Sequence, residues 1–195
     1  MLVEAKSDGR IRPLVALRFR NDNSQAHHTQ IPEEHTILNT VAREQFRSKI
    51  PLCDASFQTR VHPDDVMYNT IKAPFSCFTS QVVMQGEMSA HRPFVRTMEY
   101  VFHAELGKNI WFYIEDIFVF SDIFQEPVED STNPCSKLQN AAYYANPKKS
   151  VFFATKLHML SHMIDDDGIH PAPEKVWTII DWTRSGSQKQ PPQFN

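Results

Sequence analysis

The chain has 195 residues, of which 41% are hydrophobic and 22% are charged. This balance excludes an intrinsically disordered protein and favours one folded domain. Its 20 basic and 23 acidic residues give a net charge of −3, so the total charge gives no support for nucleic-acid binding. A local basic face could still provide phosphate contacts. No apolar run reaches the roughly 18 residues of a membrane span, so no membrane partner is expected.

The three cysteines, Cys53, Cys77 and Cys135, are widely spaced and odd in number. This pattern argues against a disulfide framework and indicates a reducing compartment. The first residues, Met1–Lys6, lack the apolar segment of a secretory signal. We therefore expect an intracellular protein, in the cytoplasm or the nucleus.

The first hundred residues contain several patterns that predict secondary structure. Partial alternation over 11–20 predicts an edge strand, and apolar residues recurring after Thr36 predict a helix. A strand is expected over 57–61, followed by a turn at 62–65. A second helix with one apolar face is expected over 93–106.

The clearest local pattern covers residues 110–120. Two β-prone apolar runs, 110–114 and 117–120, flank the acidic pair Glu115 and Asp116. Two such runs about a two-residue step predict a tight hairpin. Acidic residues are not the usual chemistry of such a turn, and a broken local rule within an apolar hairpin indicates a functional site.

The C-terminal third continues the alternation of helices and strands. A helix is expected over 129–144 and one or two strands over 151–164. Residues 165–168 predict a turn, and a short helix with proline in its first turn is expected over 173–182. The polar residues 185–195 predict a frayed tail.

Seven segments, taken together and in order, resemble one family. They are residues 12–18, 48–55, 62–65 with Thr70, 83–86 with 90–98, 112–121, 144–149 with 152–153, and 168–176 with 181–182. Over roughly residues 8–184 the chain is similar to the polymerase domain of gypsy-class LTR retrotransposon reverse transcriptases. One tetrapeptide would be weak support, whereas seven collinear segments are strong.

The resemblance implies an α+β right-hand polymerase fold, with fingers, an antiparallel palm sheet packed on helices, and only the start of a thumb. It divides the chain into a reverse transcriptase domain, 1–184, and a polar tail, 185–195. Within that domain it assigns fingers to about 1–48 and 66–84, palm to about 49–65 and 85–168, and the start of the thumb to 169–184.

The implied reaction is RNA-directed DNA synthesis, a nucleotidyl transfer that uses two Mg²⁺ ions, with Mn²⁺ as a substitute. The implied partners are an RNA or DNA template–primer and a deoxynucleoside triphosphate. By resemblance, Glu115 and Asp116 are catalytic metal ligands and Lys149 lies beside the leaving group. The residues matched to substrate or template contacts are Arg12, Arg18, Asp54, Gln85 and Gly86.

The chain departs from the family pattern at its metal-binding positions. Pro51 stands where the family has its first aspartate, and Glu115 replaces the next. Proline has no side-chain oxygen, so only the backbone carbonyl of Leu52 could ligate there. Mg²⁺ tolerates displaced oxygens poorly. The pattern therefore predicts a damaged site with weak or absent polymerase activity. The alternatives are a non-catalytic module that binds nucleic acid or protein, and a decayed retroelement fragment.

Other titratable groups have simpler explanations. His158 and His162 are four residues apart, which on the expected strand places both on one face without a third zinc ligand. A structural or surface role is therefore expected. The acidic residues 165–167 lack EF-hand spacing and predict a solvated turn.

Overall fold

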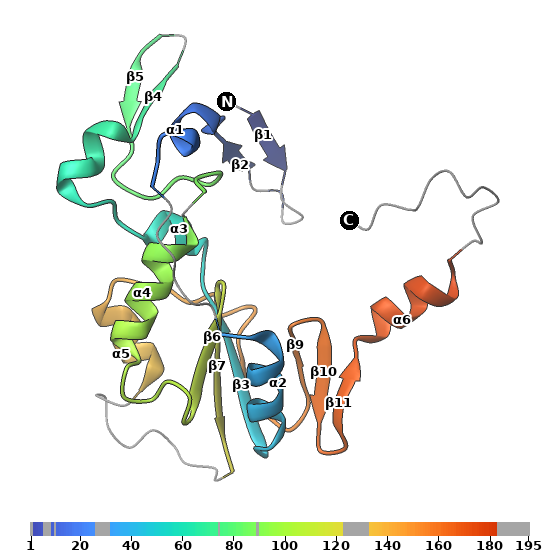
Figure 1. Cartoon of the computed structure of the whole chain (residues 1–195). Helices are drawn as coiled ribbons and strands as arrows, with labels where there is room; N and C mark the ends of the chain where they lie inside the picture. Colours follow the sequence, from blue (N-terminus) through green and yellow to red (C-terminus); the bar gives the residue numbers. More distant parts are fainter. Residues whose placement is uncertain are drawn as a thin grey trace.

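The computed structural model describes residues 2–5, 9, 11–25, 32–73, 75–88, 90–122 and 133–182. Its centre is a four-stranded antiparallel sheet with the strand order β6-β7-β3-β8 (Figure 1). The strands are β6 (Ile110–Tyr113), β7 (Asp116–Ser121), β3 (Phe46–Pro51) and β8 (Val151–Ala154). The predicted fold class, α+β with an antiparallel sheet packed on helices, is confirmed.

One face of this sheet packs on α4 (His91–Val101) and α5 (Pro134–Asn140). Phe94 and Met98 of α4 are one helical turn apart and both are buried against the sheet. The ring of Phe94 meets Phe112 edge-on, with 6.4 Å between centroids. The apolar spacing in the sequence therefore predicted the position of α4 correctly. The helix ends at Val101, several residues before the predicted position 106.

The opposite face packs on α2 (Glu34–Ala42) and on a second sheet. This sheet has the order β11-β10-β9, formed by β9 (Leu157–Met159), β10 (His162–Asp165) and β11 (Gly168–Pro171). Strand alternation explains the two cores: Ile117 of β7 is buried with the α4 side, whereas its neighbour Phe118 is buried with the α2 side.

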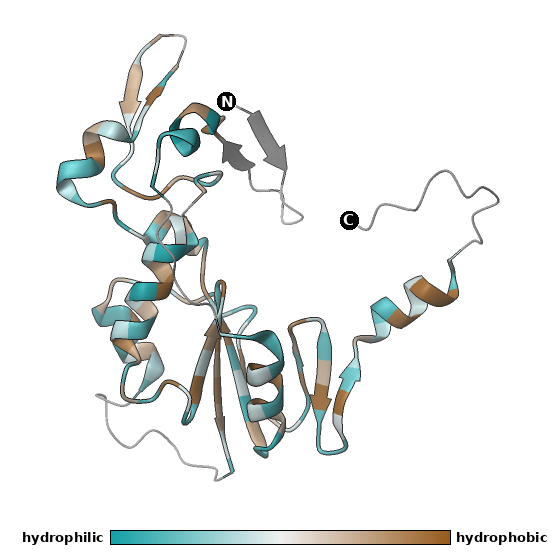
Figure 2. Cartoon of the chain, viewed as in Figure 1, coloured by the Kyte–Doolittle hydropathy of each residue, from teal (hydrophilic) through white to brown (hydrophobic). Residues whose placement is uncertain are grey.

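The remaining elements lie around the end of the central sheet at which β3 finishes (Figure 1). β1 (Leu2–Ala5) pairs with β2 (Ile11–Leu14), and α1 (Arg18–Asp22) follows. The 3₁₀ helix η1 (Pro63–Tyr68) leads into the hairpin of β4 (Thr70–Lys72) and β5 (Cys77–Thr79). The last element, α6 (Pro173–Ile180), projects from the second sheet, and Figure 2 colours part of its ribbon as hydrophobic. The apolar side chains of α6 are exposed.

Several expected elements were wrong. The strand expected over 57–61 is instead the short helix α3 (Ala55–Gln58), followed by Thr59. The strand expected over 11–20 ends at Leu14, and α1 replaces its second half. Residues 151–164 contain parts of three strands rather than one or two, because a bend at 155–156 and a tight turn at 160–161 divide them.

That turn also corrects the placement of the two histidines. His158 lies on β9 opposite Met163, and His162 lies on β10 opposite Met159. Neighbouring cross-strand pairs point to opposite faces, so the two histidine side chains lie on opposite faces rather than together. The helix expected from 129 begins at Pro134, with residues 123–132 outside the described part. The predicted tail, 185–195, also lies outside it. Within the described ranges, no helix combines the length and apolarity that crossing a membrane requires.

Candidate active site

The predicted hairpin is confirmed, but its turn lies one residue earlier than the acidic pair. Tyr113 at the end of β6 pairs with Asp116 at the start of β7, which leaves Ile114 and Glu115 as the two-residue turn. Ile114 has a φ of 53° and is 54% exposed. A β-branched residue is rare in this left-handed region and is strained there. The turn therefore holds an energetically unfavourable backbone next to both candidate carboxylates.

Pro51 lies directly opposite Asp116 in the register of β3 and β7. The next residue, Leu52, donates its N–H to the carbonyl of Glu115 over 2.9 Å. Bonded and non-bonded pairs alternate along an antiparallel ladder, so Pro51 and Asp116 form a non-bonded pair, in which side chains approach closely. The pairing of β3 with β7 therefore does not need the backbone N–H that proline lacks. Pro51 can be the last residue of β3 without the loss of a β3–β7 hydrogen bond.

Lys49 supplies the positive charge at this point of the sheet. Its Nζ lies 2.8 Å from Oδ2 of Asp116 and 6.0 Å from the ring centroid of Phe118. Lys49 is two residues before Pro51 on the same strand face. Both side chains of the ion pair are partly buried, at 21% and 28% exposure. This contact was missed in the sequence, where only the period-two spacing from Pro51 could have indicated it.

These residues do not fit a pair of divalent cations. Pro51 offers no side-chain oxygen at the position opposite Asp116, and Asp116 is already paired with an ammonium group. The backbone carbonyl of Leu52 is the other candidate ligand here, and Leu52 is bonded to Glu115. A neutral carbonyl does not replace the charge of the missing carboxylate. Across the described ranges, no three His, Cys, Asp or Glu side chains gather as a metal-binding group.

The segment around Lys149 is attached to the same end of β3. The N–H of Asn146 donates to the carbonyl of Pro51 over 2.7 Å, and the N–H of Cys53 donates to the carbonyl of Tyr144 over 3.0 Å. The Asn146 carbonyl then accepts the N–H of Lys149 over 3.2 Å, which closes a turn. The structure therefore brings the turn of Lys149 beside Pro51, with the lysine exposed.

Asp54 lies immediately after this attachment. It precedes α3 with a φ of 48° and a ψ of 58°, in the left-handed region. Gln58 of α3 reaches back, accepting the N–H of Tyr144 at its Oε1 over 2.5 Å and donating its Nε2 to the carbonyl of Cys53. Gln58 thus fixes the backbone on both sides of the candidate site, a role that the sequence did not indicate.

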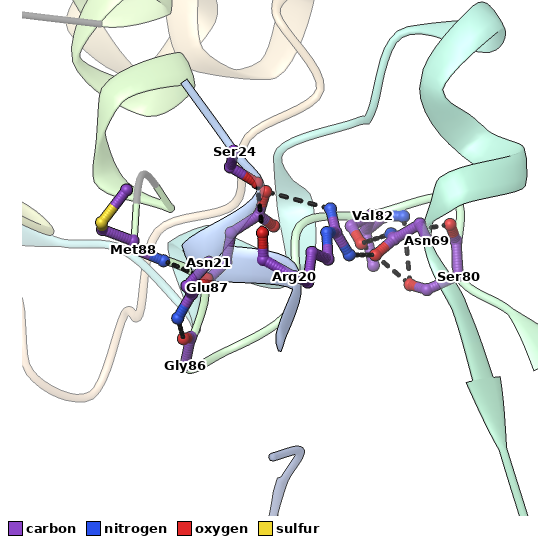
Figure 3. A network of polar contacts seen from close by, with 9 residues as sticks. All are labelled: Arg20, Asn21, Ser24, Asn69, Ser80, Val82, Gly86, Glu87 and Met88. Carbon is purple, nitrogen blue, oxygen red and sulfur yellow. Dashed lines mark hydrogen bonds and ion pairs between the residues drawn. The ribbon is translucent and has the colours of Figure 1, made fainter. Parts of the chain in front are cut away.

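Gln85 and Gly86 form a turn. Helix α1 is bonded to this turn at Gly86 (Figure 3). Asn21 of α1 donates its side-chain amide to the carbonyl of Gly86 and accepts the N–H of Met88, each over 3.0 Å. Gly86 has a φ of 100°, and a Cβ at this position would lie 3.2 Å from the carbonyl of Val15. Both its backbone angle and this close approach therefore require glycine.

Arg20 extends this network to the η1–β4 segment (Figure 3). Its guanidinium lies 3.0 Å from Glu87 and also donates to the side chain of Asn69. Asn69 is fully buried and donates to the carbonyls of Ser80 and Val82 over 2.8 and 2.9 Å. No local pattern indicates this network, because its members are distant in the chain.

The other basic residues that the resemblance matched are only partly placed. Arg18 lies exposed on α1, and Arg12 lies on β2, whose backbone alone is described. The contact of Gly86 connects its turn with α1, whereas that of Asp116 connects it with Lys49. The predicted site residues therefore fall into two groups, one at the β6–β7 turn and one beside α1.

Comparison of the sequence with known proteins identifies retrotransposon relatives. The chain is 22% identical over 179 residues to the retrovirus-related Pol polyprotein from transposon 297 of Drosophila melanogaster, covering 92% of this chain. It is 23% identical over 174 residues to the corresponding polyprotein from transposon opus of the same species. The polyprotein from transposon gypsy matches 50% of the chain at 26% identity. The chain is thus similar in sequence to a region of gypsy-class retrotransposon Pol polyproteins.

Solved structures agree with this similarity at the level of the fold. A foamy virus protease-reverse transcriptase in complex with an RNA/DNA hybrid matches 93% of this chain with a TM-score of 0.79 and 18% identity. The foamy virus enzyme in complex with double-stranded DNA matches with a TM-score of 0.77 and 20% identity. No protein-family model matches the chain.

The chain spans less than a fifth of the length of the two first polyproteins that it matches. It spans 17% of the transposon 297 polyprotein and 16% of the opus polyprotein. It likewise spans 24% of the foamy virus chain in complex with the hybrid. Activities and partners of those longer proteins therefore belong to them, and their transfer to this region requires a separate argument.

Proposed function

We propose that this reverse-transcriptase-derived domain binds nucleic acid and that its polymerase activity is weak or absent. The observation that carries the proposal is Pro51 standing opposite Asp116, where a second carboxylate would be needed. The ion pair of Asp116 with Lys49 supports it, because one of the two remaining carboxylates already has a positively charged partner. Any residual nucleotidyl transfer would use Mg²⁺, or Mn²⁺ in its place.

The size of the expected loss follows from the geometry of phosphoryl transfer. Two cations clamp the attacking and leaving oxygens, and protein carboxylates hold them in place. A displacement of about 1 Å in such a site costs about 100-fold in rate. The Glu115 side chain is one methylene longer than aspartate and so introduces a displacement of this kind. Loss of the carboxylate at Pro51 is more severe, and together these changes account for weak or absent synthesis.

The proposed partner is a template–primer made of RNA and DNA strands, with a deoxynucleoside triphosphate as a second ligand. The foamy virus relatives of this fold are bound to an RNA/DNA hybrid and to double-stranded DNA, which supports the proposal. Arg12 and Arg18 would contact phosphates, and Gln85 and Gly86 would contact template and nucleotide. Asp54 would lie near the nucleotide, and Lys149 beside the departing pyrophosphate.

Primer extension with Mg²⁺ and with Mn²⁺ tests the catalytic part of the proposal. We expect little or no product from the natural chain and a gain of synthesis from the double variant Pro51→Asp with Glu115→Asp. The control adds Asp116→Ala to this double variant, which should abolish the gain. Synthesis by the natural chain at the level of an intact reverse transcriptase would contradict the proposal.

The division into fingers (1–48 and 66–84), palm (49–65 and 85–168) and start of the thumb (169–184) is proposed on the same resemblance. An intracellular location is also proposed, because Cys53, Cys77 and Cys135 are all free thiols. A fluorescent fusion protein imaged in cells tests the location, and secretion of the fusion would contradict it.

A further inference from the structure

The edge strand β8 contains an irregularity that exposes two aromatic rings. Val151 pairs with Lys49 and Ala154 pairs with Arg47, so three steps along β8 match two steps along β3. The extra residue makes a β-bulge at Phe152 and Phe153, opposite Ser48. Phe153 has a φ of 53°, as expected for a residue forced out of the regular pleat.

The bulge is built into the sheet rather than being a frayed end. The N–H of Phe153 donates to the hydroxyl oxygen of Ser48 over 3.0 Å, and Ser48 itself is buried. A regular strand would turn adjacent side chains to opposite faces. Here Phe152 is 51% exposed and Phe153 is 42% exposed, so the bulge leaves both rings accessible.

The turn that precedes β8 adds basic and aromatic groups on the same edge. The Asn146 side chain accepts the N–H of Lys148 over 3.2 Å, and its carbonyl accepts the hydroxyl of Ser150 over 2.8 Å. Lys148 is exposed on this ordered turn. Tyr144 is 65% exposed, although both its N–H and its carbonyl are engaged with the 53–58 segment.

Charge along this edge favours an anionic ligand. From Ala141 to Ile164 the sequence contains three lysines and no acidic residue, within a chain of net charge −3. The part of this segment from Tyr144 to Phe153 lies beside β3 and the residues after it, from Cys53 to Ser48. Five residues separate Cys53 from Ser48, which is about 17 Å at about 3.3 Å per residue. This length corresponds to about five phosphate spacings of one stacked nucleic-acid strand.

We infer that Tyr144, Lys148, Phe152 and Phe153, which we call the β8 edge strip, bind a single strand of RNA or DNA. Exposed aromatic rings stack on unpaired bases of any sequence, and a neighbouring lysine contacts the phosphates. The inference deepens the nucleic-acid binding proposed above by assigning unpaired nucleotides, rather than duplex, to this edge.

Fluorescence anisotropy with the full chain and a labelled oligo(dT) of about 12 nucleotides tests the strip. We expect the double variant Phe152→Ala with Phe153→Ala to weaken binding at least about tenfold, because each stacked base is lost. Lys148→Gln should reduce the slope of log affinity against log salt by about 0.7, the value for one phosphate contact on a single strand.

Matched controls distinguish loss of the β8 edge strip from the loss of any exposed aromatic ring or charge. Tyr100→Ala removes an aromatic ring that is 86% exposed on α4, and Lys175→Gln removes an exposed charge on α6. Neither should alter binding of the oligonucleotide. Unchanged thermal melting of the double phenylalanine variant would establish that it remains folded, and its affinity for a blunt duplex should equal that of the natural chain.

The outcomes distinguish this inference from the proposed function. Duplex or hybrid binding without oligo(dT) binding would overturn the strip and leave the proposed function standing. Binding of oligo(dT) that depends on the strip, without any hybrid binding, would overturn the template–primer proposal instead. Equal oligo(dT) affinity of the double variant and the natural chain would overturn the strip. A dimer of the natural chain that the double variant abolishes would assign the edge to a protein contact and overturn it as well.

Discussion

Arg47 is the residue on which three parts of the described structure depend. It is only 2% exposed, and its guanidinium donates to the carbonyls of Val41 and Ala42 at the end of α2, over 3.2 and 3.1 Å. It also donates to the carbonyl of Thr155 and lies 3.6 Å from a carboxylate oxygen of Asp166. One side chain therefore joins α2, the β8–β9 link and the β10–β11 turn.

Arg47→Met should lower the free energy of unfolding by about 3 kcal/mol, since it leaves buried carbonyls without donors. Arg47→Lys should recover only part of this loss, because an ammonium group lacks the planar fork that reaches several carbonyls. Urea denaturation of the three proteins measures the difference. Equal stability of the methionine variant and the natural chain would contradict this account of Arg47.

Sequence reasoning had no means to identify Arg47. An arginine within an apolar strand is ordinarily expected at the surface, and its burial follows from backbone carbonyls that are 5 to 118 residues away along the chain. The pairing of Lys49 was missed because its partner, Asp116, is also distant in the chain. Pro51 and Asp116 were identified, because a collinear motif marks them without reference to any contact.

At the scale of elements, the β9–β10 hairpin has an unfavourable turn. Its two turn residues, Leu160 and Ser161, have φ values of 48° and 61°. Turns of this kind favour Asn and Gly, because other residues are strained at positive φ. Glycine would adopt the backbone angle of Ser161 without strain, because it has no Cβ.

Ser161→Gly should therefore raise the free energy of unfolding, by about 1 kcal/mol. The matched control is Gln139→Gly on the exposed side of α5, where glycine should lower stability by about 1 kcal/mol. Thermal denaturation of both variants checks the opposite signs. A loss of stability in Ser161→Gly would mean that the turn is not strained at this position.

The β10–β11 hairpin should respond to acid. Burial by itself would raise the pKa of Asp165, but the hydrogen bond from His170, the N–H of Asp167 and the charges of His170 and Lys156 outweigh it. The pKa of Asp165 is therefore lowered from its ordinary 3.8. A lowered pKa means that Asp165 stabilises the fold above pH 3.8 and that this contribution disappears as the pH falls through the lower folded value.

Melting temperatures of the natural chain and of Asp165→Asn across this pH range test the effect. The two curves should differ at neutral pH and converge in acid, below the folded pKa of Asp165. A difference that persists undiminished in strong acid would exclude ionisation of Asp165 as its cause. His170→Gln should reduce the neutral-pH difference, because it removes the first favourable partner of the carboxylate.

Elements with a strong internal pattern were predictable, and those defined by distant contacts were not. The β6–β7 hairpin and α4 were predictable from apolar periodicity, because this pattern lies within each segment and needs no knowledge of distant contacts. The α3 helix was predicted as a strand because its four residues carry too little pattern to oppose the alternation around them. Its position depends on Gln58 bonding to the backbone of Tyr144, which lies 86 residues away.

At the scale of the whole molecule, stability should be independent of divalent cations. A ligand that binds only the folded state raises the melting temperature as its concentration increases. Because Asp116 is paired with Lys49 and Pro51 offers no carboxylate, Mg²⁺ should leave the melting temperature of the natural chain unchanged. The double variant Pro51→Asp with Glu115→Asp should instead melt at higher temperature as Mg²⁺ is added.

Calorimetry at constant ionic strength, with Mg²⁺ exchanged against Na⁺, separates specific binding from salt screening. A marked Mg²⁺-dependent rise for the natural chain would contradict the assignment of Lys49 as the partner of Asp116. The same measurement on Lys49→Gln is informative, since this variant should be less stable than the natural chain in the absence of any metal.

The pairing of Lys49 with Asp116 has one further consequence, for how this domain can change over generations. Three neighbouring carboxylates repel one another in an empty polymerase site, and enzymes tolerate such instability because activity requires it. With Pro51 in place of one acid, and with Lys49 paired to Asp116, that repulsion is smaller here. Restoring an acid at position 51 would increase it again, so natural selection for a stable fold would oppose this step towards the enzyme.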